Sequence, residues 1–186
     1  TGNGAPWFLA DERPVIQLAE SLGIPLAYTT SVDLDRDAAA LAGATGFVSM
    51  GHDEYWTVAM RDRVEAARDA GTDVAFLGAN AVYWRVRLED GTLGDRRTLV
   101  GFKGTHDPVK EAADTTVKWR SSPHSRPENS LVGMLYECFP AYGSFVVQSP
   151  DSFLFAGTGV TQGQAVPGVV GTEIDRVYPI AGTPES

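Results

Sequence analysis

The residues best suited to chemistry lie in the six-residue segment Gly51–Trp56, which reads GHDEYW. It follows an apolar run, Thr45–Met50, that predicts a buried β-strand, and it precedes a stretch from Thr57 to Ala70 with helical periodicity. A histidine, acids and two aromatic residues therefore lie on a predicted strand-to-helix turn. In open α/β sheets such turns lie at the carboxyl edge of the strands, where ligands bind.

His52 and Glu54 are two positions apart, and in an extended segment such residues point to the same side. An imidazole can transfer protons near neutral pH, and a carboxylate beside it could bind a metal ion. The alternative is that both side chains cap the helix that begins near Thr57 and bind loop amides. The spacing alone does not separate these interpretations.

Four further residues are candidates for contact with a small ligand. Tyr55 and Trp56 either form one wall of a binding site or pack the turn against the sheet. Asn80 follows the predicted strand Asp73–Gly78, so we expect it at the same sheet edge as the histidine; otherwise it is a turn residue that binds its own backbone. Arg87, on the next predicted strand, either holds an anion or is a plain surface arginine.

Glu173 and Asp175 form a second pair of acids two positions apart. One carboxylate could enter a site while the other binds Arg176, or the pair could be a solvated edge. Cys138 has a strand-like position, and we expect it in the core and not as a nucleophile. The sequence has no Gly-rich phosphate loop, no CxxC pair and no Gly-x-Ser-x-Gly elbow.

The first 80 residues alternate predicted helices and strands. We expect helices over Val15–Leu22, Asp35–Ala42 and Thr57–Ala70, and strands over Ile24–Thr30, Thr45–Met50 and Asp73–Gly78. In the third helix Met60 and Val64 share an apolar face, while Arg61 and Glu65 form a pair on the solvent side. This alternation predicts parallel strands covered by helices.

The remainder, residues 81–186, has the pattern of an irregular β-rich extension. We expect strands in Ala81–Leu88 and Thr98–Lys103 around a turn at Asp90–Gly91. Short apolar runs follow at Leu131–Cys138, Ser144–Gln148, Phe153–Ala156 and Val169–Val170. We expect one unit over residues 1–186, with an α/β core in residues 1–80.

Composition excludes several classes of protein. The 186 residues carry a formal net charge of −9, which argues against binding to nucleic acid or to an anionic membrane. No apolar run approaches the roughly 20 residues that a membrane span needs. One cysteine cannot form an intrachain disulfide, which slightly favours the cytoplasm, although secretion stays open. Because the chain begins at Thr1 without an initiator Met, we expect it to be part of a longer polypeptide.

Four stretches together resemble a known family. They are Ala5–Phe8, Gly51–Trp56, Ala75–Arg85, and Phe155–Gly159 with Val170–Arg176. They are similar to the C-terminal domain of the large (β) subunit of N,N-dimethylformamidase and its relatives. The resemblance implies a fold like the class I glutamine amidotransferases: a flavodoxin-like parallel sheet flanked by helices.

The resemblance also implies a mononuclear non-haem iron site made of two tyrosines and one glutamate. Glu54 would be that glutamate, His52 the catalytic acid/base, and Glu173 a second catalytic acid. The two tyrosines are expected in sequence that precedes Thr1, so this chain would hold one of three ligands.

These observations lead to one main hypothesis and two alternatives. The main hypothesis is hydrolysis of a non-peptide C–N bond in a small amide by a metal-activated water, with this fragment inactive by itself. The first alternative is a non-enzymatic ligand- or carbohydrate-binding domain of a bacterial surface protein. The second, a cysteine amidotransferase, is disfavoured because the turn after Met50 carries no thiol. A homo-oligomer, or association with a preceding part of the polypeptide, is also possible on this sequence.

Overall fold

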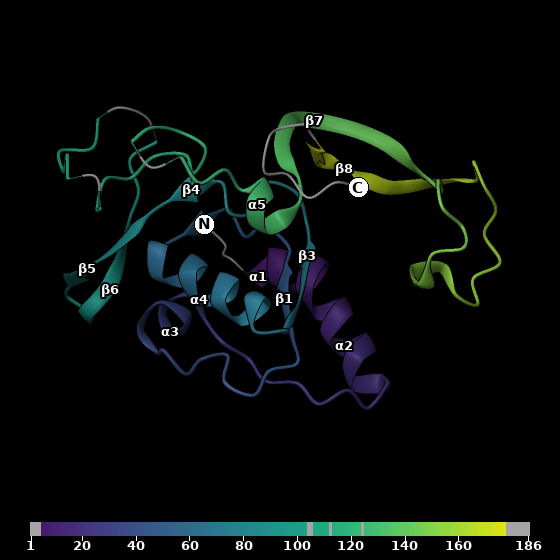
Figure 1. The fold of residues 1–186 in the computed structure, drawn as a ribbon, viewed down its shortest axis with the longest axis horizontal. Coiled ribbons are helices and arrows are strands. Elements are labelled where there is room, and N and C mark those ends of the chain that lie inside the picture. Colours follow the sequence, from purple (N-terminus) through teal and green to yellow (C-terminus); the bar gives the residue numbers. More distant parts are fainter. Residues whose placement is uncertain (1–4, 104–105, 112, 124, 178–186) are drawn as a thin grey trace.

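The structure, a computed structural model, describes residues 5–103, 106–111, 113–123 and 125–177 (Figure 1). These residues form a mixed α/β arrangement of short helices and small sheets. The elements are α1 (Ala5–Trp7), the π-helix η1 (Phe8–Glu12), α2 (Arg13–Ser21), α3 (Ser31–Arg36), β1 (Gly46–Met50), β2 (Tyr55–Trp56), α4 (Val58–Asp69), β3 (Asp73–Leu77), β4 (Trp84–Arg85), β5 (Arg87–Gly91), β6 (Gly94–Val100), α5 (Asn129–Val132), β7 (Leu135–Val146), the 3₁₀-helix η2 (Phe153–Phe155) and β8 (Ala165–Arg176).

The predicted parallel pairing in the first part of the chain is confirmed. β1 and β3 are parallel, with Phe47 beside Val74 and Met50 beside Leu77, and α4 connects them. In the described residues every sheet has two strands: β2–β4 is also parallel, whereas β5–β6 and β7–β8 are antiparallel. The mixed α/β class is therefore established, and the wider flavodoxin-like sheet stays a prediction.

Helix α4 has the start and the apolar face that the sequence predicts. The Thr57 hydroxyl accepts a hydrogen bond from the backbone N–H of Met60 at 3.2 Å, as an N-cap does. Met60 and Val64 are buried in a core that also contains Leu34, Val82, Trp119 and Leu131. Trp56 belongs to the same core, where its ring lies against those of Phe47 and Phe76.

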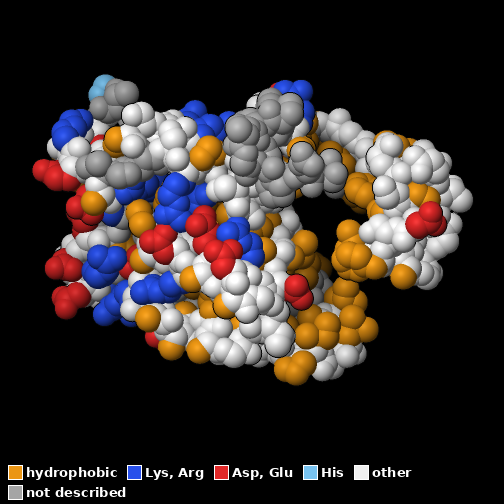
Figure 2. Space-filling view, viewed as in Figure 1, with side chains coloured by type: hydrophobic (Ala, Val, Ile, Leu, Met, Phe, Trp, Pro, Cys, Tyr) orange, Lys and Arg blue, Asp and Glu red, His pale blue; other side chains and the backbone are white. Residues whose placement is uncertain are grey.

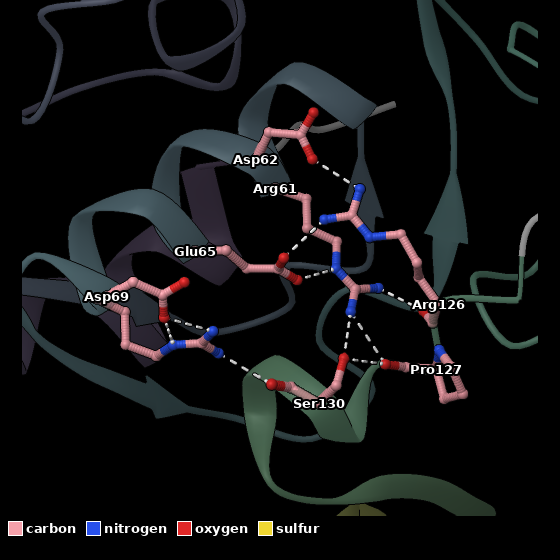
Figure 3. Close-up of polar contacts among 8 residues, drawn as sticks. Arg61, Asp62, Glu65, Asp69, Arg126, Pro127 and Ser130 are labelled. Carbon is pink, nitrogen blue, oxygen red and sulfur yellow. Dashed lines mark hydrogen bonds and ion pairs between the residues drawn. The ribbon is translucent and has the colours of Figure 1, made fainter. Parts of the chain in front are cut away.

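The expectation that Arg61 lies on the solvent side of α4 is wrong, because Arg61 is fully buried. Its guanidinium donates to Glu65 at 2.7 Å, to the Ser130 hydroxyl at 2.7 Å and to the Pro127 carbonyl at 3.0 Å (Figure 3). It also lies 4.7 Å from the ring centroid of Trp119. The reason is that the segment leading into α5 covers this side of the helix, so the predicted pair with Glu65 forms in a buried network.

Two other expectations in the first part of the chain are wrong. Residues 24–30 form no strand, and Ile24, Leu26 and Tyr28 are exposed. Pro25 removes one backbone donor there. The helix expected over Asp35–Ala42 is instead α3, which begins at Ser31 and ends at Arg36. It starts earlier because the Thr30 side chain accepts a hydrogen bond from the Asp33 N–H and caps the helix there.

In the second part, the β-rich expectation holds with shifted boundaries. The β5–β6 hairpin turns after Gly91, close to the predicted turn. The run Leu131–Cys138 begins with α5 before β7 starts, and Phe153–Ala156 forms η2 where a strand was expected. Cys138 is exposed on β7, so the expectation that it lies in the core is wrong.

The β7–β8 ribbon extends away from the helices (Figure 1). Asp151 is the only charged residue between Cys138 and Thr172 in the sequence. Figure 2 shows charged side chains gathered on the side of α4 and the β5–β6 hairpin, while the ribbon side and the surface near α2 are mostly apolar or neutral. Within the part of the chain that the structure describes, no helix is long and apolar enough to cross a membrane.

Candidate functional site

The turn that carries His52 is held close to the end of β3. Gly51 has a φ of +69°, and its N–H points to the Leu77 carbonyl at 3.4 Å. A Cβ at Gly78 would lie 2.2 Å from the Gly51 carbonyl oxygen, so only glycine permits this approach. The two strand ends therefore meet at the carboxyl edge of the parallel pair, as the sequence predicts.

After this turn the chain is fixed by β4 and the residues before it. The Asp53 carbonyl accepts from the Val82 N–H at 2.9 Å. The Glu54 carbonyl accepts from the N–H groups of Tyr83 at 3.0 Å and Trp84 at 2.9 Å. These bonds fix the backbone at Glu54, whose side chain contacts that of His52.

His52 lies between two carboxylates. Its Nε2 atom is 3.1 Å from Glu54 Oε2, and its Nδ1 atom is 3.3 Å from Glu173 Oε2. The imidazole is about half exposed (49%), whereas the side chains of Glu54 and Glu173 are 9% and 20% exposed. Glu54 comes from the same turn, but Glu173 comes from β8, so the ribbon completes the site.

Asn80 connects the β3 end to β8. Its backbone N–H donates to Asp175 Oδ1 at 2.9 Å, and its Nδ2 lies 3.5 Å from Glu173 Oε1. The residue adopts a left-handed φ of +60°, which Asn tolerates better than most residues. Its Oδ1 atom is buried and has no hydrogen-bond partner among the described residues. Burial raises the pKa of Asp175, and the bond from Asn80 opposes that rise.

The two aromatic candidates have different surroundings. Trp56 is fully buried in the core, which is the packing interpretation and leaves it no surface for a ligand. Tyr55 is half-buried beside Glu54, with Lys103 Nζ 5.0 Å from its ring centroid. Burial, together with the nearby Glu54 carboxylate, raises the pKa of Tyr55, and Lys103 opposes this rise.

The structure does not bring Arg87 to this group. Its guanidinium pairs with Glu89 at 2.6 Å and with Asp107 at 2.7 Å. It also lines a separate cavity of about 500 Å³, together with Asp35 and Thr57. Neither His52 nor either glutamate of the site lines that cavity.

Asp107, the partner of Arg87, is held by several hydrogen bonds. Although its burial would raise the pKa, hydrogen bonds from the backbone and hydroxyl of Thr116 and from Arg87 hold the pKa of Asp107 well below its usual range. This network anchors the loop after β6 to β5.

The side chains of His52, Glu54 and Glu173 are paired with one another. Both ring nitrogens of His52 face carboxylates, so these side chains are directed at one another and not at a common ion. In residues 5–103, 106–111, 113–123 and 125–177, no group of three or more His, Cys, Asp and Glu is arranged to hold a metal ion. His106 is exposed, and His124 lies outside the described residues.

Two neighbours of the site were not among the predicted residues. They are Lys103, whose pKa is raised by the neighbouring Tyr55 hydroxyl, and Tyr136 on β7, whose pKa is raised by burial and by the nearby carboxylate of Glu173. Lys103 ends a predicted strand and Tyr136 lies in an apolar run. Neither pattern carries a signal for the site, because their positions depend on how distant segments pack.

An imidazole held between two carboxylates at the carboxyl edge of parallel strands can accept and deliver protons. The chain is therefore a mixed α/β protein in which an imidazole lies between two carboxylates. A family model described as N,N-dimethylformamidase beta subunit-like, C-terminal, matches residues 1–186, and the chain belongs to that family. A search of the curated proteins found no match.

Proposed function

We propose that this domain carries the acid/base site of a hydrolase that cleaves a non-peptide C–N bond in a small amide. The observation that supports the proposal most directly is the position of His52, which is half exposed and lies within 3.3 Å of both Glu54 and Glu173. Membership of a dimethylformamidase-like family supports a hydrolase-related role. We also propose that further strands lie beside β1 and β3 and complete a flavodoxin-like parallel sheet.

In this proposal His52 moves the proton that hydrolysis requires. The oxygen of water bonds to the amide carbon, His52 takes a proton from that water, and the leaving nitrogen receives it as the C–N bond breaks. Glu173 orients the ring through Nδ1. Because Nε2 faces Glu54, the Glu54 carboxylate must turn away before Nε2 can reach water.

Glu54 is the residue of this chain that we propose as a ligand of a mononuclear iron in the full-length protein. Among the described residues, no group of three or more His, Cys, Asp and Glu is arranged to hold a metal ion, so no step of the reaction is assigned to the metal. The measurement is iron content and visible absorbance of full-length protein, wild type and Glu54→Ala. We expect about one iron per chain and a tyrosinate-to-iron band, with both lost in the variant. Equal iron in the two proteins would exclude Glu54 as a ligand.

The hydrolase proposal is tested by amine release from a panel of small amides with the full-length protein. We expect turnover in the wild type and a loss of about 10²–10⁴-fold in His52→Gln, the range for removal of a general acid/base. His106→Gln is the matched control, since that histidine is exposed and is not among the contacts of the site. Absence of turnover in wild-type protein with full iron would favour the binding-domain alternative.

A further inference from the structure

A row of aromatic rings and lysines begins beside Glu54 and runs along β2 and β4. We call Tyr55, Lys103, Trp84, Lys118 and Tyr83 the cation–aromatic strip. Lys103 Nζ lies 5.0 Å from the ring centroid of Tyr55 and 5.9 Å from that of Trp84. Lys118 Nζ lies 5.1 Å from the centroid of Tyr83 and 5.7 Å from that of Trp84. Each lysine therefore lies close to two rings.

The strip is positioned by the same backbone bonds as the site. Tyr55 pairs with Trp84 across the parallel β2–β4 sheet, and Trp84 forms an antiparallel bridge with Lys118. The N–H groups of Tyr83 and Trp84 both donate to the Glu54 carbonyl. The strip is therefore attached through the backbone to Glu54, which lies two residues after His52.

Neither lysine forms an ion pair with the described residues, although the neighbouring Tyr55 hydroxyl and the Glu54 carboxylate raise the pKa of Lys103. Among those residues, no Asp or Glu oxygen lies within 4.0 Å of Nζ of Lys103 or Lys118, whereas Arg61, Arg87 and Arg126 are all paired with acids. Lys103 is exposed and Lys118 is half-buried, so solvent reaches both. The strip therefore places two cations beside aromatic rings in a chain of net charge −9.

Rings and ammonium groups in this order match one class of ligand. A planar ring can lie against Trp84 or Tyr55, while a carboxylate on that ring can accept hydrogen bonds from the ammonium groups. A neutral dialkyl amide has nothing for the lysines to bind. We infer that the cation–aromatic strip binds the aromatic carboxylate part of the substrate, so that the amide hydrolysed at His52 carries an aryl carboxylate group.

The substrate class rests on the proposed function, but the binding site can be tested without turnover. Benzoate and benzamide are the probes, titrated calorimetrically at low ionic strength into the full-length protein. We expect benzoate to bind about tenfold tighter than benzamide in the wild type and in His52→Gln, whose strip is unchanged. In Lys103→Gln/Lys118→Gln the two probes should bind alike.

Lys110→Gln is the matched control, because Lys110 bonds the Asp107 carbonyl away from the strip. It should leave the preference for benzoate unchanged. Equal binding of the two probes in the wild type, or an equal loss in Lys110→Gln, would overturn the inference. A preference for benzoate supports ligand binding by the strip whether or not amides are hydrolysed. Failure of the proposed hydrolase function would therefore leave this result unchanged.

The substrate class is then measured with 4-formamidobenzoate and formanilide, which differ only in the carboxylate. We expect kcat/KM to favour 4-formamidobenzoate by about tenfold, and this ratio to approach one in the double lysine variant. A ratio near one in the wild type would contradict the substrate class.

Discussion

At the scale of single residues, the site depends on side chains that hold one another. His52 is oriented by Glu173, and Glu173 is in turn held by Asn80, whose buried conformation joins β3 to β8. The pairing of His52 with Glu54 could be predicted from local spacing. The contact with Glu173 could not be derived from the pattern of the sequence, and it was expected only because of the family resemblance.

Two substitutions at Asn80 separate the effect of its left-handed backbone conformation from the effect of its side-chain amide. Asn80→Ala removes the amide and keeps a Cβ at φ +60°, whereas Asn80→Gly removes the amide and relieves the conformation. We expect Asn80→Ala to lower the free energy of unfolding by about 1 kcal/mol more than Asn80→Gly, measured by urea titration. Amide turnover should fall equally in the two variants. Full turnover in Asn80→Gly would show that the contact with Glu173 is dispensable.

Asp107 gives the chain a specific dependence on acid. Its pKa is lowered in the folded protein, so its carboxylate stabilises the fold above the unfolded pKa of about 3.9. That contribution is lost as the pH falls from there toward the lower folded pKa. Asp107→Asn should be less stable than wild type at pH 7, with the difference narrowing below about pH 4 in urea titrations. A difference that does not change with pH would contradict this.

At the scale of elements, the site depends on the close approach of the ends of β1 and β3. The sequence predicted both strands and α4 because their apolar periodicity and the Thr57 cap are local signals. It failed for Ile24–Thr30, where an apolar run has no partner strand among the described residues. It also failed for Arg61, whose burial depends on a segment far along the chain.

Gly78 tests the approach of the two strand ends. In Gly78→Ala the new Cβ would lie 2.2 Å from the Gly51 carbonyl oxygen, so the His52 turn must move. We expect turnover to fall about 10²-fold, as for a small misplacement of a catalytic group, together with a lower midpoint of thermal unfolding. Gly46→Ala is the control, because its Cβ would meet only the Asp73 carbonyl, at 3.9 Å. Equal effects of the two substitutions would argue against a specific role of Gly78.

At the scale of the whole molecule, charge and packing are unevenly distributed. The charged side chains gather with α4 and the β5–β6 hairpin (Figure 2). The β7–β8 ribbon carries exposed Phe139 and Tyr142, and η2 carries exposed Phe153. A two-stranded ribbon is marginally stable by itself. The sequence indicated a β-rich second part, but not that its strands would extend away from the core.

This arrangement predicts unequal protection from hydrogen exchange in the 186-residue chain. Amides of β7 after Cys138, and of the part of β8 that pairs with them, should exchange faster than those of α4, β1 and β3. Fewer buried contacts hold this part of the ribbon. Exchange followed by mass spectrometry would show this directly. Equal protection would mean that another surface covers the ribbon, as a homo-oligomer would provide.

The central claim is that His52 and Glu173 act as one proton-transfer unit, and a double-mutant cycle of amide turnover in the full-length protein tests it most directly. The single variants His52→Gln and Glu173→Gln are compared with the double variant. Residues that act together show strongly non-additive losses, so we expect the double variant to be no slower than His52→Gln. Losses that multiply would show that the two residues act independently and would contradict the account.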